Sequence, residues 1–68
     1  MPRNDIFPKY LKQQVASYFT LEPAVRSTDG YDSQGVRFLA IRHGTDEVQM
    51  LGNRPDGKGV RESWLMLN

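Results

Sequence analysis

The residues of this 68-residue chain with types suited to chemistry cluster around its single histidine. The segment His43-Gly44-Thr45-Asp46-Glu47 places an imidazole near two carboxylates. These residue types suit general acid–base catalysis or binding of a hard metal ion. Their spacing, however, matches no catalytic or metal-binding motif. We therefore interpret His43 as an ordinary residue at the end of a strand, and we predict no catalytic residue, no metal site and no cofactor.

Three other patterns resemble functional motifs without matching them. A serine nucleophile beside His43 would require a triad, which is defined by geometry and not by composition. The loop 29–33 is rich in oxygen ligands but lacks the glycine and glutamate positions of an EF-hand. The segment Gly57-Lys58-Gly59 lacks the frame of a phosphate-binding loop and leads into a strand. We predict that both loops are solvated turns.

Composition limits the class of protein. A chain of this length forms one domain, residues 1–68, and leaves little room for both a core and a sheltered pocket, which argues against an enzyme. There is no cysteine, and nine basic residues against eight acidic ones give a formal charge of +1. No run approaches the roughly 20 apolar residues of a membrane span. We expect a soluble cytoplasmic protein with no membrane partner.

One helix is predicted near the N-terminus, over residues 8–19, with Asp5 as its N-cap. It should end at Glu22-Pro23, because proline disfavours helical geometry for the residue before it. The helix has one apolar stripe, formed by Phe7, Leu11, Val15 and Tyr18.

Short runs of β-type residues divided by turn residues follow the helix. Strands are predicted at 24–28, 36–43, 47–51 and 60–67, and loops at 29–35, 44–46 and 52–59. The fold class is therefore α+β: one amphipathic helix packed on a three- to four-stranded antiparallel sheet, in the order α-β-β-β-β of a meander.

Both faces of the predicted strands are partly apolar, although one short helix covers only one face of a sheet. Within 36–43, Phe38 and Arg42 lie on one face, and Leu39 and Ile41 lie on the other. Either loops cover the second face, or it binds a partner. The exposed patch would then comprise Leu39, Ile41, Leu65 and Leu67, or the side that carries Trp64. As the only tryptophan, Trp64 is more typical of a core than of a binding surface.

We predict a small, non-enzymatic, intracellular protein-binding module. It would act as a regulator, an inhibitor or an adaptor through a sheet face or edge, with another protein or with a second copy of itself as the partner. The predicted binding residues are Arg37, Phe38, Leu39, Ile41, Arg42, Trp64 and Leu65. The alternative is a DNA- or RNA-binding module that uses arginines and aromatic residues of the sheet. Acidic residues in the same segment nearly cancel these arginines and argue against that alternative.

Overall fold

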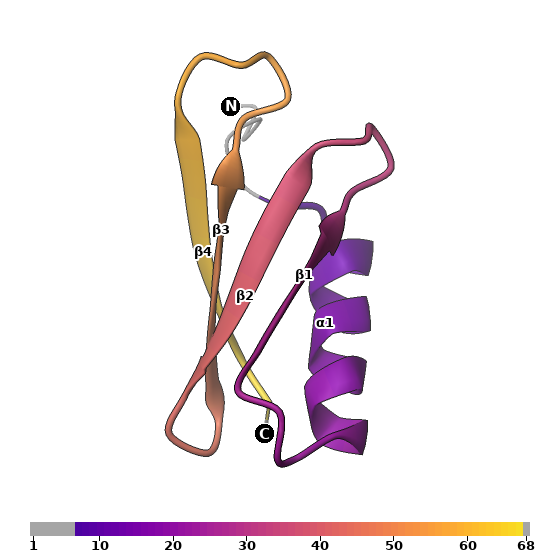
Figure 1. Ribbon diagram of the computed structural model, residues 1–68, viewed down its shortest axis with the longest axis vertical. Coiled ribbons are helices and arrows are strands. Elements are labelled where there is room, and N and C mark those ends of the chain that lie inside the picture. The colour runs from indigo at the N-terminus through magenta and orange to yellow at the C-terminus, as the bar shows by residue number, and fades with distance from the viewer. Residues whose placement is uncertain (1–6, 68) are drawn as a thin grey trace.

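The computed structural model describes residues 7–67, which form one helix followed by four strands. The elements are α1 (Lys9–Leu21), β1 (Ser27–Tyr31), β2 (Arg37–His43), β3 (Glu47–Asn53) and β4 (Val60–Met66). Each strand pairs antiparallel with the next, so the sheet has the order β1-β2-β3-β4. The helix lies against one side of this sheet (Figure 1). The α+β class and the meander predicted from the sequence are confirmed.

The boundaries of α1 follow from two prolines. Pro8 is the N-cap residue, and its carbonyl oxygen accepts hydrogen bonds from the N–H groups of Leu11 and Lys12. The predicted N-cap Asp5 lies outside the described residues. At the other end Glu22 is the C-cap, and its N–H donates to the carbonyl of Tyr18. The helix therefore ends directly before Pro23, as predicted.

The buried stripe consists of Leu11, Val15 and Phe19 of α1 together with Phe7 just before the helix, and all four are nearly inaccessible to solvent. The prediction that this stripe ends at Tyr18 is wrong, because Tyr18 is partly exposed. Both residues lie near the same face of an ideal helix. The observed stripe follows the row of residues spaced by four, which is one of the two rows along which helices pack.

The core lies between α1 and the inner residues of β2 and β3. Phe38, Ala40, Val48 and Met50 are buried there, and Val25, Leu65 and Leu67 pack against them. Gly52 leaves room at one end of this core, since a Cβ at that position would lie 2.9 Å from the carbonyl oxygen of Arg37 and 3.4 Å from the ring of Phe7. A side chain at position 52 would therefore collide with the backbone of β2 at Arg37.

Arg42 connects the sheet to the end of the helix. The last turn of α1 contains no basic residue, but the Nη1 atom of Arg42 donates to the carbonyl oxygens of Phe19 (3.0 Å) and Pro23 (3.2 Å). Its Nη2 atom donates to the carbonyl of Thr45 in the β2–β3 turn (3.0 Å). A cation at a helix C-terminus satisfies free carbonyls and complements the helix dipole. Arg42 thus acts as a structural cap supplied by a distant strand.

The first strand differs from the prediction. The predicted strand at 24–28 and the predicted loop at 29–35 are wrong in their bounds, because β1 runs from Ser27 to Tyr31 and contains Asp29 and Gly30. These two residues have low strand propensity. They pair with Leu39 and Phe38 of β2, and this tertiary pairing outweighs the local preference. The other strands lie within two residues of their predicted ends.

The turn between β2 and β3 lies at the predicted residues 44–46, and the loop between β3 and β4 covers residues 54–59 of the predicted 52–59. Gly44 between β2 and β3 and Gly57 between β3 and β4 have positive φ angles of 70° and 74°, which glycine adopts readily. The single helix among residues 7–67 is too short and too polar to cross a membrane.

Candidate functional site

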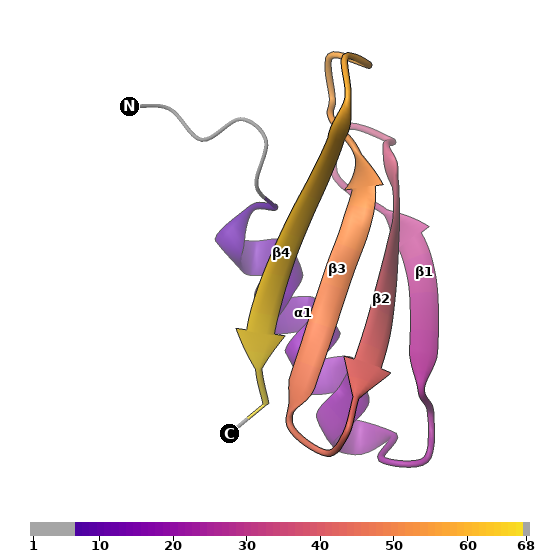
Figure 2. The same ribbon diagram turned by 90° about the vertical axis from the view of Figure 1, so that its left-hand side faces the viewer.

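The face of the sheet that points away from α1 is not covered by any other element of residues 7–67 (Figure 2). We call it the open face. Alternation along each strand and the pairing register define its members. They are Ser27, Asp29 and Tyr31 of β1; Arg37, Leu39, Ile41 and His43 of β2; Glu47, Gln49, Leu51 and Asn53 of β3; and Val60, Glu62, Trp64 and Met66 of β4.

The centre of the open face is apolar. Leu39 lies directly opposite Leu51 in the pairing of β2 with β3, and Ile41 follows Leu39 on the same face of β2. Leu39 is 40% exposed and Trp64 is 50% exposed. Large apolar side chains that remain this accessible on one face of a sheet are typical of a surface that binds a partner.

A diagonal line of polar side chains divides this apolar surface. The Nε2 atom of His43 lies 2.9 Å from the amide oxygen of Gln49, and the amide nitrogen of Gln49 donates to the Glu62 carboxylate over 2.7 Å. The Trp64 ring lies against the His43 ring, with centroids 5.3 Å apart. One apolar area therefore holds the leucines and Ile41, and a second holds Trp64 and Met66.

The first apolar area contains a shallow hollow of about 510 Å³. Leu39, Leu51 and Val60 contribute apolar walls, and an ion pair between Arg37 and Asp29 lies at the rim. The hydrogen bond and the negative charge of Asp29 raise the pKa of Arg37 above its ordinary value. The hollow could receive apolar groups of a partner, with charged groups beside it.

The open face carries more acid than base. Arg37 is its one arginine or lysine, against the three carboxylates of Asp29, Glu47 and Glu62, which gives a net charge of −2 with His43 neutral. The two other arginines on these strands, Arg42 and Arg61, lie on the face covered by α1. The alternation of side chains therefore segregates the basic residues away from the exposed aromatic residues.

Four of the seven predicted binding residues lie together on the open face: Arg37, Leu39, Ile41 and Trp64. The other three lie on the helix side. Phe38 is buried in the core, Arg42 caps the helix, and Leu65 packs against the core.

The predicted grouping of Leu39 and Ile41 with Leu65 and Leu67 was wrong, because the observed register places the first pair with Trp64 and Met66. The expectation that Trp64 belongs to the core was wrong for the same reason. Its neighbours Leu65 and Ser63 point toward α1, so Trp64 points to the open face.

No family model, no curated protein and no solved structure matches this chain.

The function is therefore inferred from the geometry of the chain alone. Among residues 7–67 no three His, Asp or Glu side chains lie close enough together to hold a metal ion. The contacts of His43 in this part of the chain are with Gln49 and Trp64, so its imidazole contributes to the open face.

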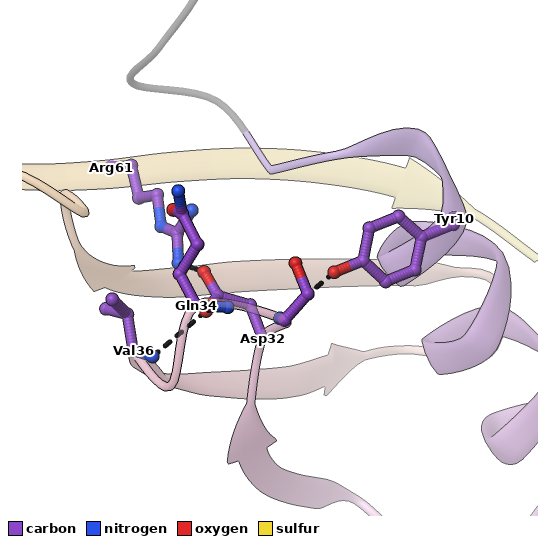
Figure 3. Close-up of polar contacts among 6 residues, drawn as sticks. Tyr10, Asp32, Gln34, Val36 and Arg61 are labelled. Atoms are coloured by element: carbon purple, nitrogen blue, oxygen red, sulfur yellow. Dashed lines mark hydrogen bonds and ion pairs between the residues drawn. The ribbon is translucent and has the colours of Figure 1, made fainter.

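A second polar cluster, which sequence reasoning missed, lies at the end of the sheet beside Phe7. Asp32 and Arg61 form a buried ion pair, with Asp32 Oδ2 2.7 Å from Arg61 Nη2 (Figure 3). The other carboxylate oxygen accepts hydrogen bonds from the N–H groups of Gln34 (2.8 Å) and Val36 (2.9 Å). The Arg61 guanidinium lies 4.1 Å from the centroid of the Phe7 ring.

The prediction of a solvated turn at 29–33 was thus wrong for Asp32, which is 9% exposed. The signal in the sequence is Asp32-Ser33-Gln34-Gly35, an aspartate followed by a glycine with φ of 79°, which is typical of a turn held by the aspartate side chain. The partner Arg61 could not be inferred, because it is 29 residues away. The carboxylate oxygens are bound within the protein, so this cluster holds the loop in place.

Acid should weaken the fold through Asp32. Burial alone would raise the pKa of this carboxyl group. The hydrogen bonds from Arg61, Val36 and Gln34 and the charge of Arg61 together lower the pKa by more than burial raises it. The pKa of Asp32 therefore lies below its ordinary value of 3.8. A carboxylate whose pKa is lower in the folded than in the unfolded chain stabilises the fold at every pH above its pKa in the unfolded chain. This stabilisation is lost as the pH falls toward the pKa in the folded chain.

We expect the difference in unfolding free energy between the wild-type protein and Asp32→Asn to be constant near neutral pH and to shrink below about pH 4. Urea unfolding over a pH series measures it. A difference that does not depend on pH would contradict the role assigned to the ionised carboxylate.

Proposed function

We propose that this protein is a small, non-enzymatic binding module that recognises a protein partner through the open face. The observation that carries this proposal is an uncovered sheet face that exposes two apolar areas, one with Leu39, Ile41 and Leu51 and one with Trp64 and Met66, separated by a line of polar side chains. Such a module would regulate, inhibit or link a larger protein, or associate with itself. An intracellular, cytoplasmic location remains a prediction from the sequence.

The chemistry of the open face supports a protein partner. Interfaces between proteins commonly have an apolar centre with aromatic residues and a charged rim, and residues that contribute most of the binding energy are enriched in tryptophan, tyrosine and arginine. Trp64 and Tyr31 are exposed on this face, and Arg37 lies at its rim. The hollow beside Leu39 would receive an apolar anchor of the partner.

Nucleic acid is the second candidate, because the exposed rings of Tyr31 and Trp64 could stack with bases. The charge of the face opposes this alternative. Binding to phosphates depends on several lysine or arginine contacts, whereas the open face has Arg37 alone against three carboxylates.

The substitution Leu39→Lys should abolish partner binding while preserving the fold. It places a charge at the apolar centre of the face, but Asp29 lies directly opposite on β1 and gives the lysine a favourable cross-strand neighbour. Leu21→Lys is the matched control. Leu21 is exposed at the C-terminal end of α1, away from the open face, where a lysine is favoured by the helix dipole.

Tagged wild-type and variant proteins would be used to capture partners from cells of the natural source, which also express an untagged copy, in parallel samples with and without nuclease. We expect Leu39→Lys to reduce the captured protein at least about tenfold, which corresponds to roughly 1.4 kcal/mol, and Leu21→Lys to leave it unchanged. Circular dichroism verifies the fold of each variant. Capture that survives Leu39→Lys, or that disappears with nuclease, would contradict the proposal.

A further inference from the structure

We infer that the partner of the open face is a second copy of this chain, which packs sheet against sheet with both helices on the outside. This inference rests on the proposed function and specifies its partner. It is carried by the arrangement of side chains on the open face, which is complementary to itself under one particular two-fold rotation. Paired sheets of this kind are common in β-sandwiches, where the sheets lie about 10 Å apart with nearly aligned strands.

The two-fold axis lies between the two sheets and runs perpendicular to the strands. It passes over the row of paired residues at the middle of the sheet, which point toward α1: Thr28, Ala40, Met50 and Ser63. Each strand then lies antiparallel on the same strand of the second copy. A symmetric dimer of this kind uses the same patch on both copies, so every contact occurs twice.

On β2 and at the ends of β4, apolar side chains meet apolar side chains in this arrangement, whereas on β3 Leu51 faces Gln49 of the second copy. On β2, Leu39 faces Ile41 of the second copy, because they lie on either side of Ala40. On β4, Val60 faces Met66 of the second copy, because both lie three residues from Ser63. Val60 and Met66 are 71% and 60% exposed in the single chain, so these contacts would cover the most accessible apolar groups of β4.

The polar groups are also complementary. Arg37 faces His43 of the second copy, and Glu47 lies beside that His43 because the two are paired across β2 and β3. An arginine at this rim therefore meets the carboxylate of Glu47 from the other chain. Glu62 faces Trp64 of the second copy, whose indole N–H can donate a hydrogen bond to a carboxylate. No two carboxylates of the open face are placed opposite each other.

The other in-plane axis, parallel to the strands, is unfavourable. It would lay β1 over β4 of the second copy and place Asp29 opposite Glu62, since both lie in one row of paired residues with Leu39 and Leu51. Juxtaposed like charges disfavour such a pairing. The charge pattern thus favours the axis perpendicular to the strands over the axis parallel to them.

A charge exchange tests this geometry. Arg37 and Glu47 lie at opposite ends of the open face, with Arg37 six residues along β2 from His43, the partner of Glu47, which is a distance of about 20 Å at 3.3 Å per residue. They cannot contact each other within one chain. Any compensation between substitutions at these two positions must therefore arise between two copies.

The experiment compares the purified wild-type protein with Arg37→Glu, Glu47→Arg and the double variant, by sedimentation equilibrium from micromolar to millimolar concentration. We expect a wild-type dimer, a dissociation constant raised roughly 10- to 100-fold in each single variant because each loses two contacts and gains two repulsions, and recovery in the double variant. Emission from Trp64, the one tryptophan, should shift to shorter wavelength as the wild-type protein associates and the indole is buried.

The outcomes separate this inference from the proposed function. A protein that stays monomeric with unchanged Trp64 emission would show that the partner is not a second copy. The inference would also be overturned if the dissociation constant of the dimer is unchanged in both single variants, or is not restored in the double variant. If Leu39→Lys still eliminates a different captured protein, the proposed function stands without the dimer. If Leu39→Lys alters neither self-association nor capture, both proposals fail.

Discussion

Replacement of Asp32 by alanine is expected to unfold most of the protein at room temperature. The substitution leaves the Arg61 guanidinium buried without its carboxylate, and breaking a buried ion pair in this way costs about 3–5 kcal/mol. It also removes the acceptor for the N–H groups of Gln34 and Val36. A domain of this length has a free energy of unfolding of only a few kcal/mol. The loss caused by Asp32→Ala is therefore close to the whole of this free energy. Circular dichroism and urea unfolding measure it.

The matched control is Asp29→Ala, which breaks the other aspartate–arginine pair of the sheet. Asp29 and Arg37 are both well exposed, and exposed ion pairs contribute little to stability. We therefore expect Asp29→Ala to remain folded, with an unfolding midpoint close to that of the wild type. Equal losses in the free energy of unfolding for Asp32→Ala and Asp29→Ala would show that burial of the ion pair of Asp32 does not increase its contribution to stability.

A double variant separates the loop from the ion pair. Asp32→Asn keeps a side-chain oxygen for the loop N–H groups, and Arg61→Met keeps most of the volume beside Phe7. If the cost arises from an uncompensated buried charge, Asp32→Asn combined with Arg61→Met should lose less stability than the two single variants together. Additive losses would contradict this explanation.

Phe19→Ala is expected to lose about 3–5 kcal/mol of stability, the usual cost of removing a buried phenylalanine. Phe19 is fully buried at the end of the α1 stripe, and its carbonyl oxygen accepts a hydrogen bond from Arg42. The cavity left by the ring would loosen the helix end that Arg42 holds. Thermal and urea unfolding of the variant measure the loss.

Tyr18→Ala provides the control from the adjacent residue. Tyr18 is 39% exposed and contacts Phe19 edge to face, with ring centroids 5.6 Å apart. Its removal should cost about 1 kcal/mol, well below the effect at Phe19. The opposite order would restore the stripe predicted from the sequence and contradict the observed helix packing.

Local chemistry was sufficient to predict the elements of this fold. One helix and four strands in a meander follow from three local signals. Pro8 and Pro23 flank the helix, glycines at 44 and 57 form turns, and β-rich runs are separated by turn residues. These signals act within a few residues of one another, so they can be read from the chain. The one poorly placed strand, β1, contains Asp29 and Gly30 and is held mainly by its pairing with β2.

Which strand residues belong to the candidate site depends on contacts between residues far apart in the chain. Alternation along β2 separates Leu39 and Ile41 from Phe38 and Arg42 in the sequence itself, but it does not say which pair faces the helix.

Only the tertiary structure decided three features: which face α1 covers, the role of Arg42 as a helix cap, and the pairing of Asp32 with Arg61. Each depends on groups that are 23 to 29 residues apart in the chain or on the register between strands. The sequence by itself determined that one face of the sheet had to remain without a helix, because a chain with a single short helix cannot cover both faces of its sheet. The physical reason for the difference is that propensity and turn chemistry are local, whereas burial is decided by the packing of the whole chain.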